Sequence, residues 1–217
     1  MALSRKNIIV LLIVLSVLLV VLVGLALYYW QSELKVEPGL KFLFNISGDG
    51  KELKTPLGVA LSDNKLFVTD SGNSQVQVFT KKGRYLFSFK VVISGNKRSY
   101  PMGIAVGDDG NIYVSEIANQ KIMVFDPSGT YLHDFPKEDK VLVKPVALAF
   151  AGGKLYVTDV GDQSIKIFSS RGRLLRKFGR GGDGEGEFAF PNGIAVSGDG
   201  TIFVADSNNS RVQVFDG

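Results

Sequence analysis

The chain has 217 residues, of which 45% are hydrophobic, and its 25 basic and 21 acidic residues give a formal net charge of +4. It contains no cysteine, which excludes disulfide bonds and thiolate chemistry. Arg5 and Lys6 precede a long apolar run, and beyond them the basic and acidic residues nearly balance. The rest of the chain lacks the basic excess that binding to phosphates requires, so we expect no nucleic-acid partner.

Residues 8–30 form the uncharged apolar run, IIVLLIVLSVLLVVLVGLALYYW. A helix rises about 1.5 Å per residue, so this run is long enough to cross a hydrocarbon core of about 30 Å. Its aromatic end, residues 28–30, is typical of a membrane border. A cleaved signal peptide, with Gly24 and Ala26 as the small residues of its cleavage site, is the alternative. The length of the run favours an uncleaved signal anchor.

The charges on either side of the run predict its orientation. Two basic residues, Arg5 and Lys6, precede it, whereas Glu33 and Glu37 lie on either side of Lys35 after it. The positive-inside rule then leaves the N-terminus in the cytoplasm and makes the chain a single-pass protein of the cell membrane. The expected order is a cytoplasmic N-terminus (1–7), a transmembrane helix (8–30), a linker (31–39) and an extracytoplasmic domain (40–217).

The extracytoplasmic part contains four repeats of about 45 residues, near 55–90, 100–135, 144–178 and 190–217. Three kinds of residue recur once in each repeat. A proline opens each repeat, an acid follows its second apolar run, and a phenylalanine ends its third. The prolines are Pro56, Pro101, Pro145 and Pro191; the acids are Asp70, Glu116, Asp159 and Asp206; the phenylalanines are Phe79, Phe125, Phe168 and Phe215.

Each repeat divides into four short apolar runs separated by turn residues. In the second repeat the runs are GIAV, NIYVS, KIMVF and TYLHDF, and the breaks between them are GDDG, EIANQ and DPSG. Short runs of β-branched and aromatic residues between such clusters are typical of antiparallel strands. Four strands per repeat of this length predict an all-β fold, a β-propeller of four-stranded antiparallel blades. Small residues in the first run, such as Gly58 and Ala60, suit the crowded centre of a propeller.

The last repeat, PNGIAVSGDGTIFVADSNNSRVQVFD, resembles the NHL repeat, and the stretch from Phe178 to Phe188 is similar to a loop between NHL blades. The third repeat departs most from the pattern because it has Ala147 where the others have glycine. The resemblance covers residues 40–217. It implies a propeller whose complete ring has six blades, so we expect this chain to be a fragment of such a ring.

Residues 40–46 (LKFLFNI) match the fourth run of a repeat, whereas the last repeat stops in the turn before its own fourth run. Residues 40–46 are therefore expected to form an outer strand. In one interpretation they complete the last blade beside residues 211–215 and close a ring of four blades, which removes open strand edges. In the other, which we favour, the chain is part of a six-bladed ring and this strand is an orphan.

We find no catalytic constellation in the sequence, and we predict no catalytic residue, no metal site and no cofactor. The single histidine, His133, lies in an expected outer strand and has no neighbouring ligand residues. Propeller lyases and hydrolases related to NHL proteins use metal and histidine clusters. The prediction is therefore a protein that is not an enzyme. A lyase or hydrolase whose catalytic and metal residues lie in blades missing from this chain is the alternative.

The repeated acids form the one constellation that stands out. Each is followed three residues later by an asparagine or aspartate. A ring of carboxylates could hold a divalent cation, but repetition at one position of every blade favours acids that accept hydrogen bonds from their own turns. In such a propeller the turns between the second and third strands lie on the same face as the loops that connect one blade to the next. The candidate binding face comprises Asp70, Asn73, Glu116, Asn119, Asp159, Asp162, Asp206 and Asn209, with the loops at 47–55, 91–100, 136–144 and 179–190.

Loops on a rigid scaffold are common sites of binding. The sequence thus predicts a membrane-anchored, extracytoplasmic propeller that acts as a scaffold for an unknown protein or small ligand on this loop face.

Overall fold

The computed structural model describes residues 19, 21–25, 42–47, 52–93 and 98–217. The chain divides into two compact units, residues 1–44 and 45–217. In the first unit, residues 19 and 21–25 are helical. The other residues of the predicted 8–30 helix, the N-terminus (1–7) and the linker (31–39) lie outside the described residues. Within the described ranges, no helix has both the length and the apolar character needed to cross a bilayer.

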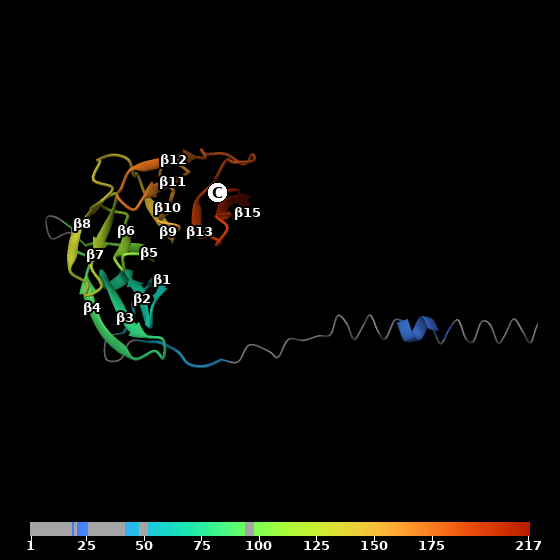
Figure 1. Cartoon of the computed structure of the whole chain (residues 1–217), viewed down its shortest axis with the longest axis horizontal. Coiled ribbons are helices and arrows are strands. Elements are labelled where there is room, and N and C mark those ends of the chain that lie inside the picture. Colours follow the sequence, from blue (N-terminus) through green and yellow to red (C-terminus); the bar gives the residue numbers. More distant parts are fainter. Residues whose placement is uncertain (1–18, 20, 26–41, 48–51, 94–97) are drawn as a thin grey trace, which may run out of the picture. The chain divides into compact units, whose positions relative to one another are not determined.

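The second unit consists of antiparallel sheets arranged as the blades of a propeller (Figure 1). Its first two sheets have four strands each, in chain order across the sheet. The first blade contains β1 (Pro56–Ser62), β2 (Lys65–Asp70), β3 (Gln75–Thr80) and β4 (Tyr85–Lys90). The second contains β5 (Pro101–Val106), β6 (Ile112–Glu116), β7 (Lys121–Phe125) and β8 (Tyr131–Phe135).

The third sheet also has four strands, whereas the described residues of the fourth form three. The third blade contains β9 (Pro145–Ala151), β10 (Lys154–Asp159), β11 (Ser164–Ser169) and β12 (Leu174–Phe178). The fourth contains β13 (Pro191–Val196), β14 (Ile202–Asp206) and β15 (Arg211–Phe215). The predicted all-β propeller with four repeats is therefore confirmed.

The turns follow from residues that tolerate a left-handed backbone. The turn between the third and fourth strands has Gly83, Gly129 or Gly172 at φ of 80, 87 and 87° in the first three blades. A side chain would strain the backbone in that region, and glycine avoids the clash. The turn between the second and third strands is a short 3-10 helix in the first blade (Ser71–Asn73) and in the fourth (Ser207–Asn209).

Successive blades pack face to face through three apolar clusters. The first and second blades share a cluster that includes Phe67, Val78 and Phe125. Further clusters join the second blade to the third and the third to the fourth. The inner strands approach so closely that a Cβ on Gly58 would lie 2.6 Å from the carbonyl oxygen of Met102 in the next blade. This contact explains why small residues occupy the first strand of each repeat.

Six of the eight repeated aromatic residues belong to the clusters between blades, whereas Phe79 packs against Tyr85 of its own blade. Phe79, Phe125 and Phe168 of the third strands are fully buried. Phe168 packs edge to face against Phe135 of the preceding blade, with 5.5 Å between the ring centroids. In the fourth blade Phe203 is exposed, unlike its counterparts in the other second strands. The second-strand rings are thus buried in the three blades that have a following blade to cover them.

The predicted outer strand at residues 40–46 differs from the structure. Its described part, residues 42–46, is in no strand, and the side chains of Phe42, Leu43 and Phe44 are exposed. A strand is held by the hydrogen bonds of a neighbouring strand, and β15 forms its described pairs with β14. A strand-like sequence alone therefore does not produce a strand here.

We predict that Phe168→Ala lowers the free energy of unfolding by about 3–5 kcal/mol, because it opens a cavity between the second and third blades. Urea unfolding followed by circular dichroism measures the change. Leu132→Ala, at an exposed position of β8, is the control and should change stability by about 0.5 kcal/mol or less. Equal effects of the two substitutions would contradict the assigned core.

Candidate functional site

The four repeated acids lie at the same place in every blade. Each ends a second strand and stands opposite the proline that opens the first strand. All four side chains, those of Asp70, Glu116, Asp159 and Asp206, are fully buried. The structure therefore places these predicted face residues beneath the surface, where their partners lie within the chain.

Asp70 shows how the first blade uses its acid. Its Oδ1 accepts a hydrogen bond from the backbone N–H of Lys54, at 2.6 Å, in the segment that leads into β1. Its Oδ2 accepts hydrogen bonds of 2.8 Å from the side-chain amides of Asn73, Gln75 and Gln77. The carboxylate thus joins three parts of the blade: the incoming linker, the 3-10 turn and the third strand.

Asp159 has the same role in the third blade, with a buried ion pair added. It accepts hydrogen bonds from the backbone N–H groups of Val143 and Lys144, at 2.8 and 2.7 Å. The ammonium of Lys166 lies 2.6 Å from its Oδ2, and both side chains are buried. Lys166 also contacts Asp162 at 2.9 Å, which brings two of the predicted face residues into one charged network.

The second and fourth blades vary the same arrangement. Glu116 accepts hydrogen bonds from the backbone N–H groups of Tyr100, at 2.8 Å, and Asn119, at 2.6 Å. Asp206 accepts hydrogen bonds from the Ala189 N–H, at 2.7 Å, and from the side chains of Asn209, Arg211 and Gln213, at 2.9 to 3.1 Å. In every blade the acid holds the linker that enters the blade, and we call this unit the carboxylate clamp.

The clamps favour the charged form of two of these acids. Burial alone would raise the pKa of Asp70, but the hydrogen bonds from Asn73, Gln75, the Lys54 N–H and Gln77 outweigh it and hold the pKa below its usual value of 3.8. Burial likewise opposes ionisation of Asp206, and the hydrogen bonds from the Ala189 N–H, Asn209, Arg211 and Gln213 lower its pKa. Both acids are therefore carboxylates at neutral pH.

The sequence interpretation of the acids as turn caps captured only part of the clamp. Glu116 and Asp159 do accept hydrogen bonds from their own turns, through Asn119 and Gly161. The linker amides and the third-strand side chains, such as Lys166, were missed. The third-strand partners could have been recognised from the sequence, because polar residues alternate with apolar ones in that strand, as in QVQVF, SIKIF and RVQVF.

The remaining members of the predicted face surround the clamps. Asn119 is exposed, whereas Asn73, Asp162 and Asn209 are partly buried. Asn73 and Asn209 donate to the acids of their own blades and also to the linker carbonyls of Glu52 and Gly182. No group of three or more metal-ligating side chains is found in the described part of the chain. The clamps thus order the loops, and the exposed loop atoms form the accessible surface.

A second repeated contact joins neighbouring blades near the axis. The Thr69 hydroxyl accepts a hydrogen bond from the N–H of Gly58, at 2.7 Å, and donates to the carbonyl of Met102 in the next blade, at 2.8 Å. Ser115 repeats this contact, donating to the carbonyl of Val146 at 2.7 Å. These hydroxyls fix the spacing of the inner strands.

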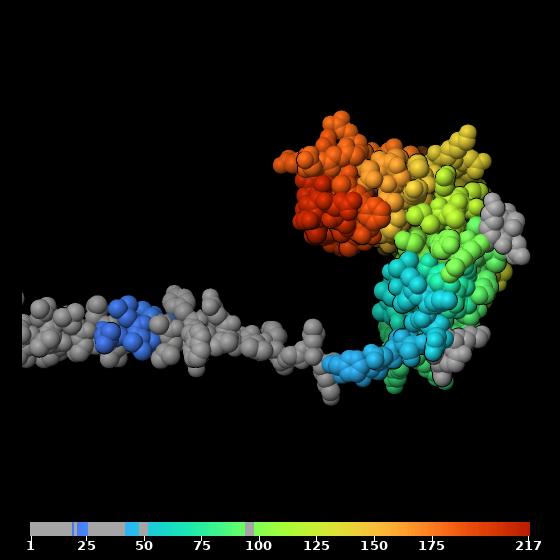
Figure 2. Space-filling view, turned by 180° about the vertical axis from the view of Figure 1, so that it is seen from behind, coloured from blue at the N-terminus to red at the C-terminus, as the bar shows by residue number. Residues whose placement is uncertain are grey.

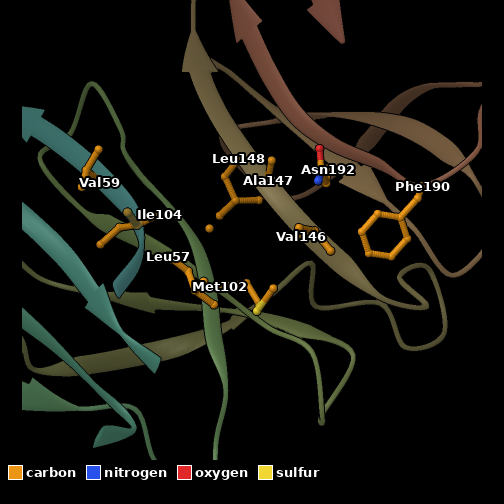
Figure 3. A pocket seen from close by; sticks show the side chains of 11 residues that line it. Leu57, Val59, Met102, Ile104, Val146, Ala147, Leu148, Phe190 and Asn192 are labelled. Carbon is orange, nitrogen blue, oxygen red and sulfur yellow. The ribbon is translucent and has the colours of Figure 1, made fainter. Parts of the chain in front are cut away.

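The inner strands enclose a groove of about 310 Å³ at the axis, shown in Figure 3. Its lining residues lie at or next to the start of the first strand of each of the four blades. The clamps lie at this same end of the strands. Most of the lining is apolar, and it includes Val59, Ile104 and Leu148. Phe190 and Asn192 contribute the aromatic ring and the polar amide. An apolar cavity with few polar groups is typical of a binding site.

Comparison with known proteins supports the fold and the repeat. The NHL repeat model matches residues 53–79 and 188–215, in the first and fourth blades. The chain is thus a β-propeller that carries NHL repeats, as the sequence pattern predicted.

The curated relatives match a short part of the chain. B-box type zinc finger protein ncl-1 of Caenorhabditis elegans is 60% identical over 40 residues, which are 18% of this chain and 5% of that protein. Protein brain tumor of Drosophila melanogaster is 52% identical over 40 residues, which are 18% of this chain and 4% of that protein. The matches therefore span about one twentieth of these relatives, and they concern the repeat alone.

Solved structures share the architecture. Virginiamycin B lyase from Staphylococcus aureus has a TM-score of 0.57 at 24% identity, over 75% of this chain and 52% of the lyase. The computationally designed Ika4 protein has a TM-score of 0.56 at 14% identity, over 81% of this chain and all of that protein. At these identities the likeness concerns the fold alone.

The clamp generates a prediction for pH dependence. Asp70→Asn places an amide donor where three side-chain amides and a backbone N–H already donate, and we expect a loss of about 1.5–3 kcal/mol in the free energy of unfolding at pH 7. Because the pKa of Asp70 is lowered in the folded state, the contribution of its charge is present above the unfolded pKa and is lost as the pH falls through the folded value.

Urea unfolding between pH 7 and pH 2 tests this prediction. The stability difference between the wild type and Asp70→Asn should shrink below about pH 4. Asp108→Asn, at an exposed position, is the control. A stability difference for Asp70→Asn that stays constant down to the lowest pH would show that the charge of the clamp is unimportant.

Proposed function

We propose that this protein is a membrane-anchored scaffold whose NHL propeller lies outside the cytoplasm and binds a protein segment or small ligand at the axial groove and the loops around it. The NHL propeller fold suggests a protein-binding scaffold. The proposal that binding takes place at the groove rests on the position of the groove. The groove opens at the end of the inner strands where the clamped loops converge.

The chemistry of the groove suits an apolar side chain or ring with a polar end. Leu57, Val59 and Met102 offer accessible apolar contacts, and the Phe190 ring is partly exposed at the edge. The amide of Asn192, which accepts a hydrogen bond from Ser207, adds a polar group at the same edge. A ligand would displace water from this lining and gain free energy from the apolar area that it covers.

The clamps support binding by keeping the surrounding loops in place. Each linker is held by hydrogen bonds to a buried carboxylate, so the loops lose little conformational freedom when a partner docks. Preorganisation of this kind improves affinity because less ordering is required on binding. We propose a non-catalytic role on these grounds.

An enzyme whose catalytic and metal residues lie in further blades is the alternative. The likeness to virginiamycin B lyase is at the level of the fold, so it does not favour this alternative over a scaffold. Histidines in further repeats of a longer form of the polypeptide would support it.

Site-specific photo-crosslinking tests the groove. p-Benzoylphenylalanine replaces Phe190 at the groove, or Leu132 on the outer strand β8, in the full chain in its native membrane. The two side chains are equally exposed, at 44 and 45%, so they provide a matched pair. We expect a covalent adduct from position 190 and little or none from position 132. Equal yields from both positions would contradict binding at the groove.

Protease accessibility tests the proposed orientation, which rests on Arg5 and Lys6 before the apolar run of residues 8–30. Protease added to spheroplasts should remove the region beyond Gln31 while a cytoplasmic marker protein stays intact. Digestion of the propeller only after the membrane is permeabilised would place it on the cytoplasmic side and refute the proposal.

A further inference from the structure

The interface between the third and fourth blades differs from the one before it in the size of one side chain. These two blades lie side by side, orange and red in Figure 2. At the interface between the second and third blades, the Tyr113 ring packs against Phe150, with 5.6 Å between the ring centroids. Tyr156 and Val196 occupy the corresponding positions at the next interface. Because valine is smaller than phenylalanine, the space beside Tyr156 is filled less completely.

A pocket of about 230 Å³ lies at this place, and we call it the interblade pocket. Its lining includes Lys154 and Tyr156 of the third blade and Val196, Ser197 and Asp199 of the fourth. The lining also includes the turns between the first and second strands, so the pocket lies at the end of the blades opposite the clamps and the axial groove. Pockets for drug-sized molecules have about 300–1,000 Å³, so a ligand here must be smaller.

The hydroxyl of Tyr156 has no hydrogen-bond partner within residues 52–93 and 98–217, the part of the propeller that the structure describes. The side chain is 4% exposed and lines the interblade pocket. The hydroxyl of Tyr131, by contrast, donates to Asp134 at 2.9 Å. Buried tyrosine hydroxyls usually have a partner. A ligand in the interblade pocket would supply one for Tyr156.

Two opposite charges also line the interblade pocket, one from each blade. Asp199 accepts hydrogen bonds from the Ser197 hydroxyl and from the N–H of Thr201. The Ser197 hydroxyl, followed by the N–H and side chain of Thr201, lowers the pKa of Asp199, so this residue is a carboxylate at neutral pH. Lys154 supplies an ammonium from the third blade. Among the residues that the structure describes, neither of the two charges forms an ion pair.

These charges define the chemistry of a ligand. A simple anion attracted by Lys154 would also meet the carboxylate of Asp199 in the same small pocket, and a simple cation would meet the ammonium. A molecule that carries both an ammonium and a carboxylate satisfies both groups. We propose that the interblade pocket binds a small zwitterion of the free amino acid class, with its carboxylate at Lys154 and its ammonium at Asp199.

The rest of the lining suits the remaining atoms of such a ligand. The Tyr156 hydroxyl can donate to its carboxylate. Ala151 and Val196 form an apolar wall that accepts a short side chain. The size of the pocket favours an amino acid such as L-alanine over one with a long side chain.

Equilibrium dialysis of radiolabelled L-alanine against the full chain in mild detergent tests the proposal. We expect saturable binding to the wild type. Tyr156→Phe keeps the ring and removes the hydroxyl, so it should weaken binding about three- to tenfold. Tyr113→Phe is the matched control, because it makes the same change at the interface that Phe150 fills, and it should leave binding unchanged. Acetate and methylammonium, which each carry one of the two charges, should compete poorly.

Two further variants test the pocket itself. Val196→Phe reproduces the filled interface of the preceding blades and should abolish binding, while thermal melting followed by circular dichroism verifies the fold. Lys154→Gln removes an exposed charge and should weaken binding even if Val196→Phe does not fold. The proposal is overturned if the folded wild type does not bind L-alanine saturably, or if Lys154→Gln and Tyr156→Phe bind it as the wild type does. Competition by acetate as strong as that by unlabelled L-alanine would show a simple anion site and would also overturn it.

Discussion

The structure depends on one repeated interaction, a buried carboxylate that holds the linker entering each blade. A propeller has little regular structure to fix the segments between its blades, and their backbone groups need partners wherever they leave solvent. Asp70, Glu116, Asp159 and Asp206 supply these partners by accepting the linker N–H groups. Each blade is thereby tied to the path of the chain that precedes it.

The clamp also explains where a site can form. The carboxylates are buried and already accept hydrogen bonds from within the chain. A ligand on this face would therefore contact the exposed loop atoms and the apolar groove between the inner strands. Gly58 and Gly103 allow those strands to approach, and the hydroxyls of Thr69 and Ser115 hold them at that spacing. The groove is thus a product of backbone packing more than of any one side chain.

Much of the fold could be predicted from the sequence because the pattern is local and occurs four times. Strand lengths, the glycine turns and the small inner-strand residues follow from short-range rules, and repetition made them recognisable. The groove could not be predicted, because Phe190 and Val59 line the same groove only through the arrangement of separate blades. The exposure of Phe203 was missed for the same reason, since its sequence context equals that of Tyr113 and only the neighbouring blade differs.

The clamps also restrict how the four repeats can diverge from one another. Lys166 neutralises Asp159 in the third blade, whereas Gln77 and Gln213 occupy its position beside Asp70 and Asp206. The second blade has the longer Glu116 with Met123 at that position, and its carboxylate takes its partners from the backbone. Moving Lys166 into the second blade, or Met123 into the third, would leave a buried charge with a changed set of partners. The acid and the third-strand residue beside it therefore constrain each other: Asp70 and Asp206 each have a glutamine as partner, whereas Asp159 has a lysine.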